Sequence, residues 1–125
     1  MEHYEISLDG QRGIAELRLA GGMTAHDHRK AREELMGLCR KAGVRRILVD
    51  ASELLEQPAA SELFDFASGW PAILMHAPVV VAGVLPSSDA VRRWWRLGED
   101  TAVNRGLISH SFETREEARA WLARW

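Results

Sequence analysis

Cysteine is nearly absent from this sequence of 125 residues, which contains only Cys39. A single thiol excludes an internal disulfide framework and suits a reducing compartment. Excess charge of one sign is absent as well, because 16 Lys and Arg residues stand against 18 Asp and Glu residues, for a formal net charge of -2. The chain therefore has no general attraction for nucleic acid or an anionic membrane, and we expect no nucleic-acid partner.

Long hydrophobic runs are missing too. No run approaches the about 20 apolar residues that a membrane-spanning helix needs, and residues 77–85 reach less than half of that length. Residues 1–5 lack the basic and apolar segments of a signal peptide. We therefore expect a cytoplasmic protein without a membrane span. Hydrophobic residues at 46% and charged residues at 27% are ordinary for a globular protein, so residues 1–125 are expected to form a single domain.

The sequence does contain one unit that occurs four times, an apolar β-rich run followed by a turn and an amphipathic helix. Residues 107–112 alternate apolar and polar side chains as a half-buried strand does. Thr114 then begins a helix, and Glu117 follows three residues later in the spacing of a capping box. Strands that alternate with helices predict a mostly parallel sheet with helical crossovers.

The remaining elements follow from the same patterns. Residues 4–8 and 14–19 predict an antiparallel hairpin, and residues 45–50 and 79–85 predict further strands. Thr24 can cap the first long helix, with Asp27 in its first turn and Gly43 at its end. We expect the second helix to begin near Pro58 and to end at Pro71. The predicted fold is α/β, with a five-stranded mixed sheet whose first strand is antiparallel, four strand–helix units and four main helices.

The sequence contains no convergent set of catalytic or metal-ligating residues. His26, Asp27 and His28 lie too close together to share a helix face, because helical metal pairs need a spacing of three or four. His28 falls on the apolar stripe, where we expect it to pack at the helix end. Cys39 lies beside the same stripe and is expected to be a small apolar filler. No serine elbow, phosphate loop or dinucleotide motif occurs. We expect no catalytic residue, no cofactor and no metal, and hence not an enzyme.

Polar side chains follow two neighbouring predicted strands, where ligands of open α/β sheets bind. They form a candidate rim for a ligand or partner, with a structural alternative in which Ser87 or Ser88 caps the next helix and Asp50 ends its strand through turn hydrogen bonds. The candidate residues are Asp50, Ser52 and Glu53 after one strand, and Ser87, Ser88 and Asp89 after the other.

A cluster of tryptophan and arginine in residues 92–96 adds Trp94 and Trp95 to the candidate rim. In the structural alternative, at least one of these indoles packs on the sheet while the arginines are solvated. The other alternative is a partner-docking or ligand-gating surface, because Trp and Arg are enriched at binding hot spots.

This order of elements resembles that of the SpoIIAA-like proteins of the STAS superfamily, which include bacterial anti-sigma-factor antagonists and are structurally related to lipid-binding SEC14 domains. The similarity covers nearly the whole chain. Its most specific parts are residues 98–106 (GEDTAVNRG), Phe112 and residues 117–122 (EARAWL), which resemble the last crossover and final helix of uncharacterised members. The resemblance implies a SpoIIAA-like fold and a regulatory module that docks to a protein partner, such as a regulatory kinase or a protein of a sigma-factor pathway. A homodimer is compatible with it.

The chain departs from this family at one site. The anti-sigma-factor antagonists carry a phosphorylated serine in an Asp-Ser-Ser-Gly run at the start of the second helix. Here the corresponding residues 57–62 read QPAASE, in which Ser61 is the nearest hydroxyl and completes the candidate rim. The sequence therefore favours a module without this phosphorylation switch.

A second function follows from the kinship with SEC14 domains, namely carrying a small apolar, lipid-like ligand. Such a ligand would lie between the helices and the sheet, in a cavity lined by aromatic side chains of the second and third predicted helices. These are Phe64, Phe66, Trp70, Trp94 and Trp95.

Overall fold

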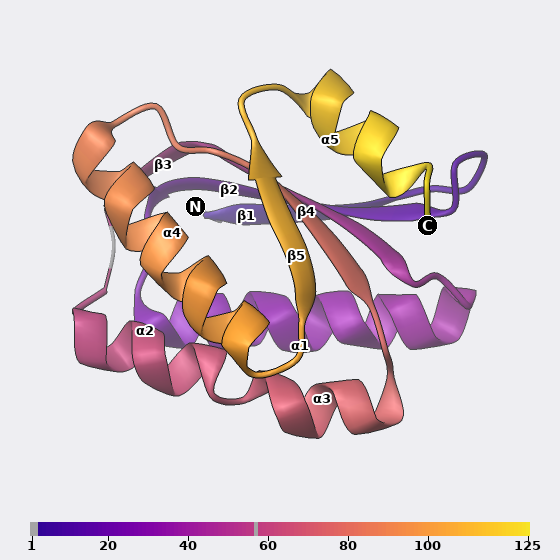
Figure 1. The fold of residues 1–125 in the computed structure, drawn as a ribbon, viewed down its shortest axis with the longest axis horizontal. Coiled ribbons are helices and arrows are strands. Elements are labelled where there is room, and N and C mark those ends of the chain that lie inside the picture. Colours follow the sequence, from indigo (N-terminus) through magenta and orange to yellow (C-terminus); the bar gives the residue numbers. More distant parts are fainter. Residues whose placement is uncertain (1–2, 57) are drawn as a thin grey trace.

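The computed structural model describes residues 3–56 and 58–125. One sheet contains five strands in the order β1-β2-β3-β4-β5 (Figure 1). β1 pairs antiparallel with β2, and all other neighbours pair parallel. The predicted hairpin and mixed sheet are thus confirmed. The strands are β1 Tyr4–Asp9, β2 Ile14–Gly22, β3 Arg46–Glu56, β4 Val80–Val84 and β5 Ile108–Phe112.

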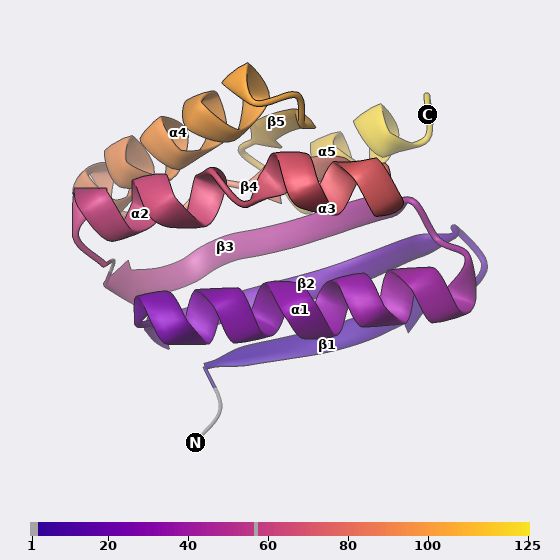
Figure 2. The same ribbon diagram turned by 90° about the horizontal axis from the view of Figure 1, so that it is seen from below.

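The helices are α1 Ala25–Ala42, α2 Ala60–Ala67, α3 Trp70–His76, α4 Asp89–Asn104 and α5 Arg115–Leu122. Crossovers of one hand that step in one direction across a sheet place their helices on the same face. Accordingly, α1 to α4 cover one face and α5 covers the other (Figures 1 and 2). The larger hydrophobic core lies beneath α1 to α4, and a smaller one that includes Ala118 and Leu122 lies beneath α5.

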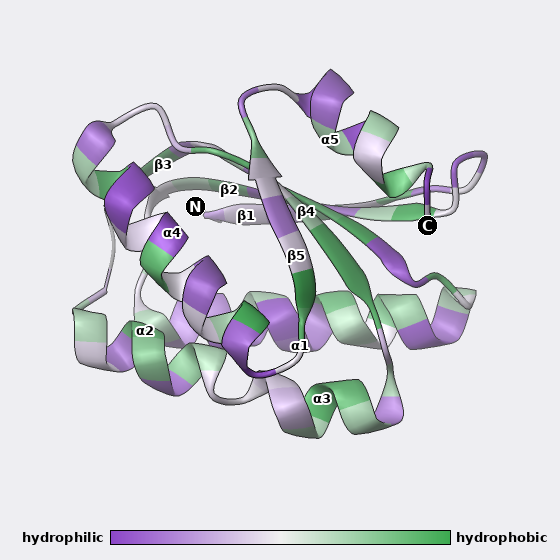
Figure 3. Ribbon diagram, viewed as in Figure 1, coloured by the Kyte–Doolittle hydropathy of each residue, from purple (hydrophilic) through white to green (hydrophobic). Residues whose placement is uncertain are grey.

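The interior strand β4 shows why this architecture forms. Val81, Ala82 and Val84 are all buried, because β4 has strands on both sides and helices over both faces. Figure 3 shows β4 as hydrophobic along its length, whereas α1 and α4 alternate hydrophobic and hydrophilic positions. Continuous apolar runs therefore become covered strands, and amphipathic runs become the layers over them.

Helix capping follows the sequence closely. The Thr24 hydroxyl accepts from the Asp27 backbone N–H at 3.1 Å, and the Asp27 carboxylate accepts from the Thr24 N–H at 3.0 Å, which is a complete capping box. At the other end of α1, Gly43 has φ 69 in the left-handed region. The box predicted at Thr114 is only half formed, because the Glu117 carboxylate accepts from the Thr114 hydroxyl and not from its backbone N–H.

The third strand is longer than predicted. Asp50, Ser52 and Glu53 do not follow β3 but lie within it. Pairing with β4 ends at Asp50, opposite Val84, and β3 then continues beside β2 with two register shifts. Polar side chains at these positions are typical of a turn. The chain nevertheless stays extended, because its backbone N–H and C=O groups form hydrogen bonds with β2.

The crossover from β3 to β4 contains two short helices where one was predicted. Pro71 does not end a helix but lies in the first turn of α3, where proline is tolerated because that N–H has no helical partner. α2 begins after Ala59, so Pro58 precedes the helix, and Gln57 lies outside the described residues. The break between α2 and α3 falls at Ser68 and Gly69.

Candidate functional site

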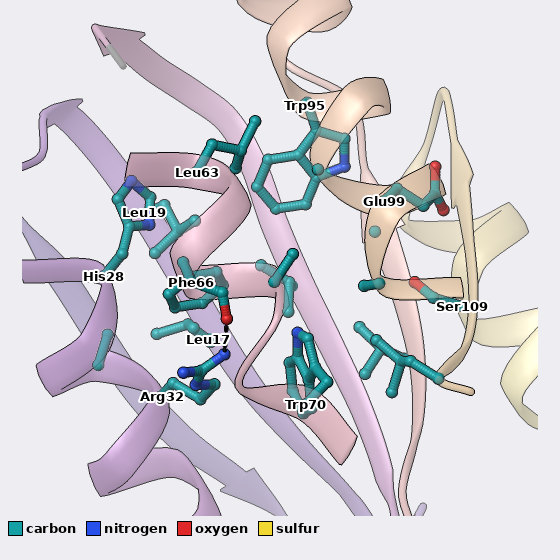
Figure 4. Close-up of a pocket in the computed structure, with 18 of the residues that line it drawn as sticks. Leu17, Leu19, His28, Arg32, Leu63, Phe66, Trp70, Trp95, Glu99 and Ser109 are labelled. Atoms are coloured by element: carbon teal, nitrogen blue, oxygen red, sulfur yellow. Dashed lines mark hydrogen bonds between the residues drawn. The ribbon is translucent and has the colours of Figure 1, made fainter. Parts of the chain in front are cut away.

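A cavity of about 120 Å³ lies between the sheet and the helices on its larger face. Figure 4 shows side chains from α1, α2, α3, α4 and β5 converging on it. Its floor is the sheet and its walls are the helices, and most of its lining is hydrocarbon. The floor residues are Leu17, Leu19, Ile47, Val49, Val81, Gly83, Leu107 and Ser109, and the wall residues include Leu35, Leu63, Phe66, Trp70, Trp94 and Trp95.

The cavity arises from a sequence pattern on each layer. The floor side chains are two residues apart along β2, β3 and β4, as the pleat requires for one face of a sheet. The helices contribute several small residues to the lining. Those small residues are Ala31, Ala67, Gly98 and Ala102.

Gly98 brings two of the walls together. A Cβ at this position would lie 2.8 Å from Leu63 Cδ1, so a larger residue here would require the Leu63 side chain to move. A glycine in the interior of a helix is by itself destabilising. In the structure Gly98 is instead a packing position at the edge of the cavity.

His28 is buried in the wall on the α1 side. Its ring centroid lies 5.9 Å from that of Phe66 and 5.5 Å from that of Trp94. Burial lowers the pKa of His28 to about 4, so the ring is neutral at pH 7. Neither His28 Nε2 nor Trp94 Nε1 has a hydrogen-bond partner among the described residues. The predicted packing role of His28 is confirmed, but its neighbours are the aromatic rings of α2 and α4.

Arg32 lies one turn further along α1 and brings a guanidinium to the cavity. Its Nη1 donates a hydrogen bond of 2.6 Å to the Phe66 carbonyl (Figure 4). Its Cζ lies 4.0 Å from the Phe66 ring centroid and 5.2 Å from that of Trp70. Arg32 is therefore held by a carbonyl and two aromatic rings.

Trp95 and Glu99 form the wall on the α4 side. Trp95 Nε1 donates to Ser111 Oγ at 3.0 Å. Gly83 makes room for this pair, because a Cβ there would lie 2.8 Å from Ser111 Oγ and 3.2 Å from Trp95 Nε1. Burial raises the pKa of Glu99, although hydrogen bonding with Ser111 and the nearby His110 act in the opposite direction.

The opposite face holds a network of charges beneath α5. Arg115 reaches Asp50 at 2.7 Å and Glu16 at 2.6 Å, and Arg119 also reaches Glu16, at 3.0 Å. Ser52 donates to Asp50 through its backbone N–H and its hydroxyl. Burial raises the pKa of Asp50, but the bonds from Ser52 and Arg115 outweigh this, so the pKa lies below its ordinary value. The network fixes α5 to β2 and β3.

The residues of the predicted rim lie in several places. Asp50 and Ser52 belong to the network under α5, and Glu53 pairs with Arg18 at the surface. No hydrogen bond or ion pair joins these three to Ser87, Ser88 or Asp89 in the described part of the chain.

The other rim residues lie at helix starts or at the cavity. Ser88 caps α4, as the structural alternative stated, while Ser87 and Asp89 are exposed beside it. Ser61 is exposed in the first turn of α2. Trp94 and Trp95 line the cavity.

Of the aromatic residues expected around a ligand, Phe66, Trp70, Trp94 and Trp95 line the cavity. Phe64 does not, because it is 51% exposed and lies under Arg105. Sequence reasoning missed Arg32 and Glu99, whose charges resemble an ordinary solvated helix face. The one available signal was that Arg32 follows the buried Ala31 on the apolar edge of α1.

No group of three or more His, Cys, Asp or Glu side chains among the described residues is placed to hold a metal ion. No helix within residues 3–56 and 58–125 has the length and hydrophobicity to cross a bilayer.

No family model matches the sequence, and neither does any curated protein. Among solved structures, the chain is similar to an uncharacterized protein of the DUF3478 family with a SpoIIAA-like fold, from Shewanella loihica PV-4. The match has a TM-score of 0.64 at 16% sequence identity and covers 98% of this chain and 95% of that chain. This likeness confirms the SpoIIAA-like α/β fold and, at this identity, concerns the fold alone.

Proposed function

We propose that this protein is a non-enzymatic binding module that holds a small apolar ligand in the cavity between α1, α2, α4 and the sheet. The observation that supports this most is the cavity itself, about 120 Å³ in volume and lined almost entirely by hydrocarbon. An engineered core cavity of about 150 Å³ stays dry and binds benzene. Filling a space of this kind with an apolar group therefore lowers the free energy, because the lining atoms gain van der Waals contacts.

The polar atoms in the walls support the same function. His28 is neutral at pH 7, and the Trp94 indole is an uncharged donor. Both residues line the cavity, and each has a buried nitrogen without a hydrogen-bond partner among the described residues. The site therefore suits a ligand that is largely apolar with a small polar group.

Docking to a protein partner is the other candidate. It gains some support from exposed apolar side chains, since Phe64 is 51% and Met75 is 82% exposed on α2 and α3. It loses support from Trp94 and Trp95, because these candidate hot-spot residues line the cavity. Capture of a reproducible partner by protein whose cavity is empty would favour docking over ligand carrying.

Native mass spectrometry of freshly purified protein tests the proposal. We expect a species heavier than the chain that loses its extra mass on denaturation. A single undecorated mass at full occupancy, in protein purified without detergent, would contradict ligand carrying.

Two variants on adjacent residues of β4 locate the bound species. Val81 lines the cavity, whereas Val80 packs on the opposite face. Val81→Phe is expected to abolish the heavier species because the larger ring fills the cavity. Val80→Phe, which adds the same volume on the other face, is expected to retain it.

A further inference from the structure

Arg32 is the feature of the cavity that an apolar ligand alone does not explain. It is half-buried and lies against Phe66 and Trp70. None of the ion pairs among the described residues includes it. Glu62 also lines the cavity but makes no ion pair with it. Burial lowers the pKa of Arg32 to about 10, so the guanidinium stays charged at neutral pH. A partly desolvated cation without a counter-ion is costly and therefore unusual.

The contacts of the guanidinium leave most of its donors free. Arginine has five N–H groups in a planar fork, and the hydrogen bond to the Phe66 carbonyl uses one on Nη1. Gly69, between α2 and α3, leaves room for Nη2 of the guanidinium, since a Cβ at this residue would lie 2.7 Å from Arg32 Nη2. Gly69 has no positive φ that would require glycine, because its φ is -78. The backbone conformation therefore does not explain the glycine at position 69, whereas the room that the Arg32 guanidinium needs does explain it.

We infer that the ligand carries a carboxylate, which Arg32 binds through its free N–H groups while the apolar part of the ligand fills the cavity. The inference rests on the proposed function and adds the chemical class of the ligand. A carboxylate matches the planar fork of arginine and forms two parallel charge-assisted hydrogen bonds with it. It would also supply an ion pair, which none of the described residues forms with Arg32.

The size of the cavity limits the rest of the ligand. A volume of about 120 Å³ is on the order of that which accepts a single benzene ring. The ligand class is therefore a monocarboxylic acid with one small ring or a short alkyl chain. A diacyl lipid is larger than this space.

Benzoate and benzyl alcohol test the inference, because they share one small ring and differ in charge at the polar end. Binding is measured by quenching of tryptophan fluorescence, to which Trp70, Trp94 and Trp95 contribute from the cavity wall. The wild-type protein is expected to bind benzoate at least about tenfold more tightly than benzyl alcohol. Arg32→Gln is expected to remove this preference and to leave benzyl alcohol binding within about twofold of wild type.

Arg29→Gln is the matched control. Arg29 lies one turn earlier on α1 and is exposed, so its loss changes the net charge equally without changing the cavity. Gly69→Ala is a second variant that tests the role of Arg32, because it keeps the charge but displaces the guanidinium. It is expected to weaken benzoate binding several-fold and to spare benzyl alcohol, and it decides the matter if Arg32→Gln fails to fold by circular dichroism.

The possible outcomes separate the inference from the function on which it rests. If both probes bind with equal affinity, or if the preference survives in Arg32→Gln and Gly69→Ala, then the carboxylate assignment is wrong and the apolar site stands. If neither probe binds the folded wild-type protein, then the proposed function fails and the assignment fails with it.

Discussion

The rings of His28 and Trp94 lie 5.5 Å apart between centroids and connect the first crossover helix to the last in the wall of the cavity. Burial lowers the pKa of His28 to about 4, and Asp27, whose charge raises the pKa, does not compensate. The neutral imidazole is thus a condition for the native packing of α1 against α2 and α4.

This relationship predicts a loss of stability in mild acid. The pKa of His28 is about 4 in the folded state and 6.5 ordinarily. As the pH falls from 6.5 towards 4, the unfolded chain binds a proton that the folded protein does not. This difference lowers the free energy of unfolding by about 2–3 kcal/mol at pH 4.5 relative to pH 7. Urea unfolding of wild type and His28→Phe at the two pH values measures it.

Between pH 7 and pH 4.5, His28→Phe should lose less stability than wild type. His26→Phe, at an exposed position of the same helix turn, should behave as wild type. Equal losses in wild type and His28→Phe would show that His28 is not held neutral.

The charge network under α5 predicts a large effect from one arginine. Arg115→Met leaves the Asp50 side chain, which is 9% exposed, without its cationic partner, and also removes a contact of Glu16. The free energy of unfolding should fall by about 2–4 kcal/mol. Arg18→Met breaks a pair whose side chains are 53% and 56% exposed, so its cost should stay below about 1 kcal/mol.

Chemical denaturation compares the two variants. Adding Asp50→Asn to Arg115→Met should recover part of the loss, because it removes the buried unpaired charge. If Arg115→Met costs no more than Arg18→Met, then the network does not hold α5 to the sheet.

Two glycines in helices should respond in opposite ways to alanine. Gly98→Ala places a methyl group 2.8 Å from Leu63 Cδ1 and should cost about 1–3 kcal/mol of stability. Gly37→Ala in α1 meets no atom within 4 Å and should add about 0.5–1 kcal/mol. Thermal unfolding monitored by circular dichroism gives both signs. A gain in stability for Gly98→Ala would mean that α2 and α4 are not in close contact there.

The sequence alone predicts the order of elements well. Periodicity locates the strands and most of the helices, although the one helix predicted between β3 and β4 is two. Thr24, Gly43 and Ser88 lie at the helix ends where their side chains or backbone suggest. These signals are local, so they can be recognised without knowledge of the packing. Where polar residues continue an extended chain, as at Asp50 and Ser52, the local signal of a turn is wrong because pairing with β2 decides the outcome.

The cavity depends on relationships between segments far apart in the chain. Arg32 contacts Phe66 and lies close to Gly69 only because α1 and the α2–α3 crossover lie side by side. The Trp95 contact with Ser111 likewise joins α4 to β5. The residues next to Arg32 in the sequence do not predict its aromatic neighbours, so its role can be recognised only from the packing. The aromatic composition of the helices predicts that rings are present near the sheet, but not which of them face the cavity.

The central claim is that a small apolar molecule enters the cavity, and the five tryptophans provide the most direct measurement. Trp70, Trp94 and Trp95 line the cavity, whereas Trp121 and Trp125 pack together elsewhere, with ring centroids 5.7 Å apart. In a titration with benzyl alcohol followed by ¹H–¹⁵N spectra, the indole signals of the first three should shift together. Those of the last two should remain in place. No shift in any of the three cavity indoles, or shifts confined to Trp121 and Trp125, would contradict the claim.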